Sequence, residues 1–318
     1  MNNVCLICMN KACLRLIDKH SDKNIEYSLF ECSVCGVCFW VPFKNPGSGW
    51  YEKDERYKMA NDNPSLDPTK NHKKILDFLT PMTGRVFDVG CGTGNFLNWA
   101  NKHGWNVSGI DFDSNAITTA KNHFLLPNVE MGTLDNYIDK YKLKYKYDLV
   151  TFFDVFEHID NHNHFVRQVK SLLVPNGYVA MSMPYRFASR WLQPHDLPPR
   201  HLTRWSRKSL KEFLEREGFD VLFIERQQTS FFNIVMKLRF KYGRLFSFGL
   251  VKKVSEKKRG FGESDSKLSL DLNKRKIIHT VAKIKDVTLF GVPALILWIY
   301  FRFSGKIYTD LFAIAQKR

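Results

Sequence analysis

The stretch VFDVGCGTGNFLNWA, from Val86 to Ala100, places an acid and three alternating glycines between two apolar runs. The apolar residues before the glycines favour a buried strand, and those after them recur at helical spacing. A strand that ends in a glycine-rich turn and leads into a helix often holds a nucleotide-like ligand. The stretch therefore predicts a ligand-binding turn within an α/β domain.

Helical and extended patterns alternate on both sides of this turn, from about residue 70 to residue 226. Such alternation requires right-handed crossovers and a mostly parallel sheet with helices on both faces. A doubly wound α/β domain is expected, with its ligand at the carboxyl ends of the strands. Strands are predicted at residues 85–89, 105–111, 128–132, 147–153, 177–184 and 219–226. Helices are predicted at residues 72–79, 165–173 and 209–218, and two more are predicted to begin at Asn95 and Ser114.

Length and composition agree with a folded, intracellular protein. The 318 residues, 44% of them hydrophobic, suffice for one full domain with large additions or for two domains, and they exclude a disordered tail. The opening MNNVCLICMNK lacks a basic segment followed by an apolar one, so a reducing cytoplasm is expected. The seven cysteines are then thiols or metal ligands.

The positive charge is concentrated in the last third of the chain. Residues 1–199 hold 22 Lys+Arg and 21 Asp+Glu, whereas residues 200–318 hold 26 and 11. Nearly all of the formal net charge of +16 therefore comes from the last third, where contact with an anionic surface is expected.

The N-terminal segment contains two CxxC pairs, Cys5 with Cys8 and Cys32 with Cys35, separated by 23 residues. Four thiolates at this spacing can close a tetrahedral Zn²⁺ site, and the metal would stabilise a segment too short for a core of its own. The pattern predicts a separate zinc ribbon over residues 1–45. Its closed four-thiolate site leaves no open position for a substrate.

Two alternatives remain for the cysteines. Cysteine behaves as a small hydrophobe, so the four residues could be buried free thiols. Cys38 is an alternative to Cys32 as the partner of Cys35. Cys13 and Cys91 have no place in the pattern.

Two cofactors compete for the glycine turn. A dinucleotide fold needs G-x-G-x-x-G/A, and here Asn95 stands where the third small residue belongs. Asp111, at the end of the next strand, can accept both hydroxyls of a ribose, which suits NAD or S-adenosylmethionine; it could also be a solvated strand-end acid. Asp88, just before the glycines, suits a cationic ligand better than a pyrophosphate. The turn therefore favours S-adenosylmethionine.

The segments DVGCGTG, GIDFD, YDLVTFFDVFEHI and LLVPNGYVAMSMP resemble, in this order, the motifs of class I S-adenosylmethionine-dependent methyltransferases. The resemblance covers about residues 73–225. It implies a Rossmann-like sheet of seven strands whose last, antiparallel strand is YTDLFAIAQKR. It further implies that the methionine part lies by Asp88, Gly90 and Gly92, the ribose by Asp111, the adenine by Phe112, Thr133 and Leu134, and the sulfonium by Asp154.

A second resemblance reaches beyond the core. A zinc ribbon followed by a tyrosine-bearing segment, as in ECSVCGVCFWVPFKNPGSGWYEKDERY, precedes many methyltransferases of bacterial surface-glycan and secondary pathways. LPPRHLTRWSRKSLKEFLEREGF is similar to their substrate-side loop, in which Pro-Pro-His-His is common. This chain has Arg200 in place of the first histidine, so only His201 is carried over.

Methyl transfer to a hydroxyl needs positioning and a route for a proton. His201 is the preferred base, because an imidazole titrates near neutral pH and its loop follows a strand's carboxyl end; alternatively it braces the loop beside Trp205. Glu157 and His158 are further catalytic candidates. Their D-x-x-E-H context also resembles the Mg²⁺-binding cluster of ubiquinone-pathway O-methyltransferases, although a structural role is an alternative.

Residues 227–306 have no place in the minimal fold. They interleave aromatic and basic residues and end in the apolar run 289–301, which is too short to span a bilayer. Basic residues flank the run, as in a helix that lies among anionic headgroups. A buried cap helix or a dimer interface is the alternative.

The sequence thus predicts a cytoplasmic S-adenosylmethionine-dependent methyltransferase that acts on a small or lipid-linked acceptor, such as a sugar hydroxyl or carbon. Its helical insertion would contact the inner face of the membrane. An RNA methyltransferase and a non-catalytic cofactor-binding module are the alternatives. The expected parts are a zinc ribbon (1–45), a linker (46–72), the core (73–226), the basic insertion (227–306) and the last strand (307–318).

Overall fold

A computed structural model describes residues 4–51, 53, 55–62, 64–65, 67–246 and 288–318. The chain divides into two compact units. The first comprises Met1–Gln227 and Thr309–Arg318, and the second comprises Gln228–Tyr308.

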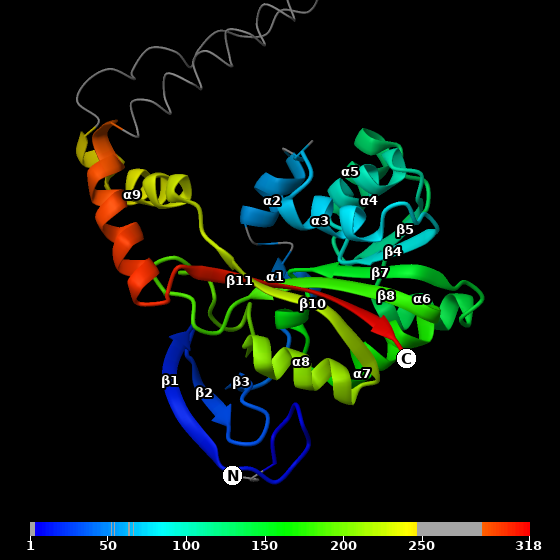
Figure 1. Ribbon diagram of the computed structural model, residues 1–318, viewed down its shortest axis with the longest axis horizontal. Helices are drawn as coiled ribbons and strands as arrows, with labels where there is room; N and C mark the ends of the chain where they lie inside the picture. Colours follow the sequence, from blue (N-terminus) through cyan, green and yellow to red (C-terminus); the bar gives the residue numbers. More distant parts are fainter. Residues whose placement is uncertain (1–3, 52, 54, 63, 66, 247–287) are drawn as a thin grey trace, which may run out of the picture. The chain divides into compact units, whose positions relative to one another are not determined.

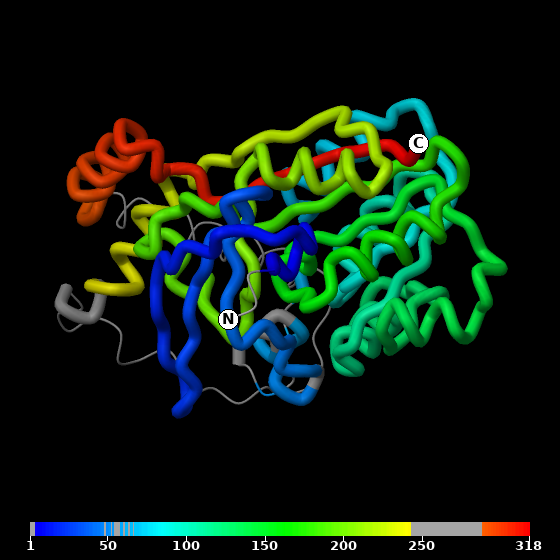
Figure 2. The backbone as a smooth tube through the Cα atoms, turned by 90° about the horizontal axis from the view of Figure 1, so that it is seen from below, coloured from blue at the N-terminus to red at the C-terminus, as the bar shows by residue number. Residues whose placement is uncertain are grey.

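Within the described residues, the first unit contains a seven-stranded sheet in the order β10-β11-β8-β7-β4-β5-β6. Strands β4 to β8 pair in parallel, and β11 pairs antiparallel with β8, as the expected Rossmann-like fold requires. In both views β11 (red) runs beside much earlier segments (Figure 1 and Figure 2). The strands are β4 (Arg85–Val89), β5 (Asn106–Asp111), β6 (Val129–Met131), β7 (Tyr147–Phe153), β8 (Leu173–Pro184), β10 (Phe219–Gln228) and β11 (Tyr308–Lys317).

Helices cover both faces of the sheet, so the doubly wound α/β prediction is confirmed (Figure 1). On one face lie α3 (Lys70–Leu79), α4 (Asn95–Lys102) and α5 (Ser114–Phe124); on the other lie α6 (Leu134–Tyr141), α7 (His162–Leu172) and α8 (Arg207–Arg216). This unit also contains the short helices α1 (Ser48–Tyr51), α2 (Glu55–Asp62) and η1 (Phe156–His158).

Helix α6 is absent from the sequence prediction. Its apolar residues Leu134, Tyr137, Ile138 and Tyr141 recur at helical spacing, but the sequence prediction placed no element between residues 132 and 147. A capping box between Thr133 and Asn136 starts the helix. Tyr137 then packs its ring 4.4 Å from that of Phe87, which is fully buried on β4.

A second sheet joins the N-terminal segment to the core. Among the described residues it has four strands, β1 (Leu14–Asp22), β2 (Ile25–Cys32), β3 (Cys38–Val41) and β9 (Thr203–Arg204), in that order. Strand β9 belongs to the loop that follows β8, and it pairs antiparallel with β3. The separate ribbon that the sequence suggested is therefore packed into the first unit, because its last strand has a partner in the core.

Polar contacts reinforce this junction. Arg186, in the loop after β8, forms an ion pair with Glu31 and donates to the carbonyl of Gly36. Asn163 of α7 donates to the carbonyl of Ile7 at 3.0 Å. We refer to residues 4–45, which make these contacts, as the cysteine module.

The second unit is built from two described helices, α9 (Phe231–Phe246) and residues 288–303. A hydrogen bond from the backbone of Thr229 to that of Ile307, at 3.0 Å, ties the ends of the unit together. Within the described ranges, no helix combines the length and apolarity that crossing a membrane requires. Residues 247–287, which hold much of the predicted basic insertion, lie outside those ranges.

Substitution of Gly109 on β5 tests the close packing of the sheet against the glycine turn. A Cβ there would lie 2.8 Å from Leu97 Cδ1 and 2.9 Å from the carbonyl oxygen of Asp88. We expect Gly109→Ala to destabilise the protein by about 1–3 kcal/mol, because the backbone oxygen cannot move aside. Thermal melting measures this, at about 2–4 °C per kcal/mol for a domain of this size.

Gly49→Ala is the matched control, since the added methyl group meets nothing within 4 Å and lies in helix α1. It should leave the melting temperature unchanged or slightly higher. Equal melting temperatures for the two variants would contradict the packing described.

Candidate functional site

The glycine turn joins β4 to α4 and is fastened to the neighbouring strand. The backbone amides of Gly90 and Cys91 donate to the carbonyl of Ile110 on β5, at 2.8 and 3.0 Å. Gly92 adopts a φ of +51°, a left-handed conformation that glycine reaches without strain. Its amide is thereby turned toward the end of β5.

The carboxylate of Asp111 accepts a hydrogen bond from the Gly92 amide at 2.8 Å. It accepts a second hydrogen bond from the amide of Asp113 at 2.9 Å. Burial raises the pKa of Asp111 to about 6, although the two hydrogen bonds act to lower it. A carboxylate has about four acceptor positions, so two remain for a ligand that carries hydroxyl groups.

Asp88, the acid before the glycines, is 3% exposed. Its carboxyl accepts a hydrogen bond of 2.6 Å from the hydroxyl of Thr151 on β7. Burial raises the pKa of Asp88 to about 8, so the group is mostly protonated at neutral pH. A bound cation would favour its ionised form.

The residues expected around an adenine ring lie near this turn but in different environments. The amide of Gly132 donates to the carbonyl of Asp111 at 2.9 Å, which holds Thr133 and Leu134 close to β5. The hydroxyl of Thr133 takes part in the capping box of α6, and Leu134 is buried. Phe112 packs its ring 4.9 Å from that of Tyr51.

Tyr51 was not singled out by sequence reasoning, although the segment that contains it was. It ends α1, is 2% exposed, and places its hydroxyl 3.1 Å from Nδ1 of His158. It therefore connects Phe112 to the second group of predicted residues.

The catalytic candidates converge. Glu157, His158 and His201 bring one ligand-type atom each within 4.8 Å of the others, a grouping that could also hold a metal ion. His201 Nε2 lies 3.9 Å from Glu157 Oε1. Nearby Asp154 has a φ of +56°, strained for a non-glycine residue, and accepts a hydrogen bond from Ser182 at 3.0 Å. Burial raises the pKa of Asp154.

Glu157 is almost completely buried, and burial raises the pKa of its carboxyl well above the usual range. The charges of neighbouring carboxylates act in the same direction. Its Oε2 has no hydrogen-bond partner among the described residues. A buried carboxyl group with an unpaired oxygen is suited to a polar ligand group.

His158 is held as a neutral imidazole, because burial lowers its pKa to about 3. Its Nδ1 lies 2.6 Å from the carbonyl oxygen of Arg200. Since a carbonyl only accepts, Nδ1 carries the proton and donates.

Two acids beside this cluster escaped the sequence prediction. Asp196 lies 3.0 Å from His201 Nδ1, and Asp310 on β11 has its pKa raised to about 6 by burial and by the charges of Asp154 and Asp196. No motif assigns a role to either acid, although Asp310 lies in the segment expected as the last strand. Antiparallel pairing of Asp310 with Pro184 brings it to the edge of the sheet where β8 ends, a long-range relation that local sequence does not reveal.

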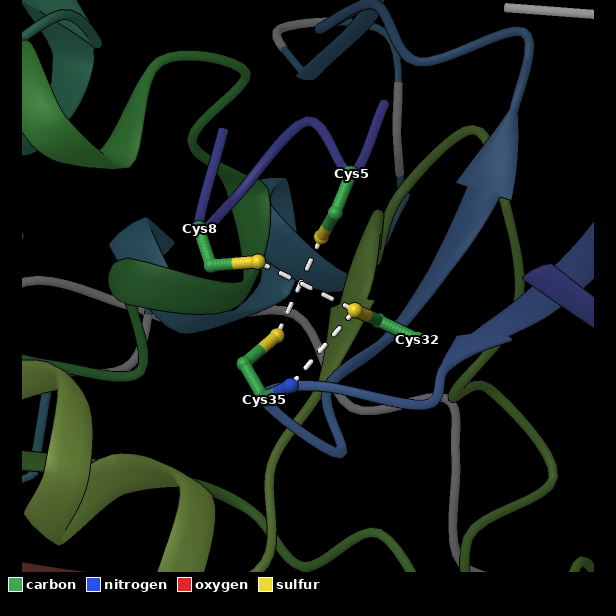
Figure 3. Close-up of side chains that lie close together, drawn as sticks. All are labelled: Cys5, Cys8, Cys32 and Cys35. Atoms are coloured by element: carbon green, nitrogen blue, oxygen red, sulfur yellow. Dashed lines mark hydrogen bonds between the residues drawn. The ribbon is translucent and has the colours of Figure 1, made fainter. Parts of the chain in front are cut away.

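The four predicted zinc ligands lie together. Figure 3 shows the side chains of Cys5, Cys8, Cys32 and Cys35 pointing toward a common centre. Cys5 and Cys35 Sγ are 3.8 Å apart, as are Cys8 and Cys32 Sγ. A tetrahedron with Zn–S bonds of about 2.3 Å has edges of about 3.8 Å, so the donor set fits zinc.

Backbone amides also face these sulfurs. Ile7 N lies 3.4 Å from Cys5 Sγ, and Val34 N lies 3.3 Å from Cys32 Sγ, as expected of sites that stabilise thiolates. Three other cysteines lie outside the cluster, namely Cys13, Cys38 and Cys91. Cys38 is therefore not the partner of Cys35; it is buried in β3, which raises its pKa to about 11.

A glycine turn with a hydroxyl-accepting acid, next to a cluster of acids and imidazoles, can bind a nucleoside-like cofactor and take a proton from an acceptor. Known proteins with similar sequences carry out related chemistry. A family model described as "Methyltransferase domain" matches residues 55–223, more than half of the chain.

Curated relatives include ubiquinone biosynthesis O-methyltransferases. That of Escherichia coli O127:H6 is 30% identical over 157 residues, covering 47% of this chain and 62% of the relative. That of Cronobacter sakazakii is 26% identical over the same length and is covered to 61%. The chain thus spans about three fifths of these relatives.

A solved structure, described as a SAM dependent methyltransferase from Archaeoglobus fulgidus, aligns with 85% of this chain and 99% of its own at 19% identity, with a TM-score of 0.47. The family match covers the glycine turn, Asp111 and the cluster around Glu157. The chain belongs to the methyltransferase domain family.

Proposed function

We propose that this protein transfers the methyl group of S-adenosylmethionine to a hydroxyl group of a small or lipid-linked acceptor. The observation that carries the proposal is the position of Asp111. It is fixed by the amides of Gly92 and Asp113 and keeps acceptor capacity for ribose hydroxyls. Membership of the methyltransferase domain family supports the same cofactor.

In this proposal, the residues at the carboxyl edge of the sheet divide the cofactor between them. Asp88, Gly90 and Gly92 face the methionine part, and Phe112, Thr133 and Leu134 face the adenine. Asp154 lies at the sulfonium end. Buried acids such as Asp88 and Asp154 favour a ligand with positive charge, because its binding relieves the cost of ionising them.

The cofactor supplies an activated methyl group bonded to a sulfonium. The protein has to place the acceptor oxygen in line with that bond and remove its proton. His201 Nε2 and the carboxyl group of Glu157 are 3.9 Å apart, so one hydroxyl oxygen can lie within about 2.8 Å of both. With the cofactor bound, His201 Nε2 would take the hydroxyl proton as the methyl group moves from the sulfur to that oxygen.

Two observations support a hydroxyl acceptor, and in particular a sugar hydroxyl. The curated relatives are named O-methyltransferases, which supports a hydroxyl over a carbon acceptor. A sugar hydroxyl agrees with the several buried acids around His201, because carboxyl groups hydrogen-bond well to polyols.

We further propose that Cys5, Cys8, Cys32 and Cys35 hold a structural Zn²⁺. The sulfur spacing and the amides directed at the sulfurs support it.

The second unit is proposed to contact the inner face of the cytoplasmic membrane. In the helix 288–303, large apolar side chains are exposed, among them Val292 at 70%, Ile296 at 63% and Phe303 at 89%. Exposed cationic side chains accompany them at Arg239, Lys241, Arg302 and Lys306. Apolar groups among bases match an anionic lipid surface better than an RNA groove, which needs stacking rings and charge.

Asp111→Ala should weaken S-adenosylmethionine binding by about 1–3 kcal/mol, because the ribose hydroxyls lose a buried acceptor. Isothermal titration calorimetry measures the change, which corresponds to roughly a 5- to 150-fold rise in Kd. The matched control is Asp148→Ala, which removes a strand carboxylate that accepts the amide of Arg85 at 2.8 Å, away from the glycine turn. Unchanged affinity in the Asp111 variant, or tighter binding of NAD, would refute the cofactor assignment.

Metal analysis should find one Zn²⁺ per chain in protein purified without chelator, because the cysteine cluster offers one tetrahedral site. Cys8→Ser should lose the metal, whereas Cys13→Ser, an exposed cysteine outside the cluster, should keep it. Calorimetry on the Cys8 variant should still detect S-adenosylmethionine binding, since the two sites share no ligands. Metal-free wild-type protein would count against the site.

Vesicles of anionic phosphatidylglycerol should bind the protein more tightly than vesicles of neutral phosphatidylcholine. Ile296→Asp and Phe303→Asp should each weaken co-sedimentation at least about tenfold, because burial of such a side chain contributes about 1.5–3 kcal/mol. Part of the binding should persist at high salt, since apolar burial is not screened.

Leu125→Asp is the control, as it places the same charge on an exposed apolar position of the first unit. It should bind vesicles like the wild type. Absence of vesicle binding, together with RNA affinity that falls steeply with salt concentration, would favour the RNA methyltransferase alternative.

A further inference from the structure

Asp196 lies between the predicted base and an arginine. Its Oδ1 is 3.0 Å from Nδ1 of His201, and its Oδ2 is 2.9 Å from Nε of Arg204. The exposed fraction of the side chain is 6% at Asp196, 14% at His201 and 11% at Arg204. At such depth water screens the charges little, so the contacts constrain the side chains strongly.

The geometry points to Asp196 as the positioning residue of His201, held in turn by Arg204 and the cysteine module. This inference rests on the proposed function, because it gives His201 the part of the base. It gives roles to Asp196 and Arg204, to which the sequence motifs assign none, and it assigns the cysteine module a part in building the site.

The carboxylate decides which nitrogen of His201 is protonated. An ionised carboxylate only accepts hydrogen bonds, so a neutral imidazole must donate to it from Nδ1–H. The lone pair is then on Nε2, the nitrogen 3.9 Å from Glu157 Oε1. Only this tautomer can take a proton from an acceptor placed between His201 and Glu157.

Arg204 fixes Asp196 by two contacts. Its Nε forms the ion pair with the carboxylate, although without the alignment of a hydrogen bond, and its Nη2 donates to the backbone carbonyl of Asp196. Both parts of Asp196 are therefore tied to one guanidinium, which removes most of the freedom of the loop at this residue.

The cysteine module holds Arg204 from the other side. Arg204 pairs with Cys38 across the β3–β9 ladder, and its guanidinium lies 5.6 Å from the centre of the Trp40 ring, within cation–π range. The backbone amide of Trp40 donates a hydrogen bond of 2.9 Å to the carbonyl oxygen of Leu202. The amide of Leu202 in turn donates a hydrogen bond of 2.7 Å to the backbone carbonyl oxygen of Glu157. One row of hydrogen bonds thus runs from the module to the acid that faces His201.

Nitrogen NMR of ¹⁵N-histidine-labelled full-length protein tests the inference without any acceptor. At about pH 9, where imidazoles are neutral, His201 should carry its proton on Nδ1, with the other tautomer below about one tenth. His201→Gln assigns the signals. In Asp196→Asn, whose amide can donate to Nδ1, the tautomer with the proton on Nε2 should become the major form.

Asp135→Asn is the matched control, because Asp135 forms a similar contact of 2.8 Å with His164 on an exposed surface. It should leave the His201 signals unchanged. Arg204→Gln should raise the minor tautomer of His201 above one tenth, and melting curves with S-adenosylmethionine calorimetry check that each variant is folded.

Wild-type protein with the His201 proton on Nε2 would overturn the inference, even if the Asp196 variant failed to fold. An Asp196→Asn variant that is folded and has unchanged His201 signals would overturn it as well. Failure of the wild type to bind S-adenosylmethionine would instead refute the proposed function, whatever tautomer His201 shows.

Discussion

The parallel register of β4 with its neighbours is the constraint on which the candidate site depends. Asp88 is aligned with Thr151 on β7 and with Gly109 on β5, so the hydroxyl of Thr151 meets the carboxyl of Asp88. The same register brings the glycine turn against Asp111 at the end of β5. Because side chains alternate along a strand, a slip of one residue would turn Asp88 to the other face and separate these groups.

Local sequence predicted the parts of the site that depend on local structure. The glycine turn and the acid at the end of β5 follow from spacing within about 25 residues, and the four cysteines follow from two short repeats. His201 and Glu157 were found by resemblance, and the loop brings them together. Each of these residues belongs to a motif that can be recognised from its immediate neighbours in the sequence.

The remaining features depend on contacts between distant segments. Asp310 reaches the site through its pairing with β8, and Asp196 is held by Arg204, which itself pairs with β3. Strand β9 has two residues and no apolar alternation, so it becomes a strand only because β3 supplies a partner. The cysteine module, which the sequence suggested as a separate unit, depends on the same contact, because its strand β3 pairs with β9.

The position of β11 has a consequence for the order in which the protein can fold. This strand lies between β8 and β10 in the sheet, yet it follows β10 in the chain by about eighty residues. Until it has left the ribosome, β8 exposes an unpaired edge and β10 has no neighbour to join. Such edges attract other chains, so a chain that lacks β11 should aggregate more readily than the complete sheet. The acid cluster is likewise complete only when β11 has paired with β8, because Asp310 lies on β11.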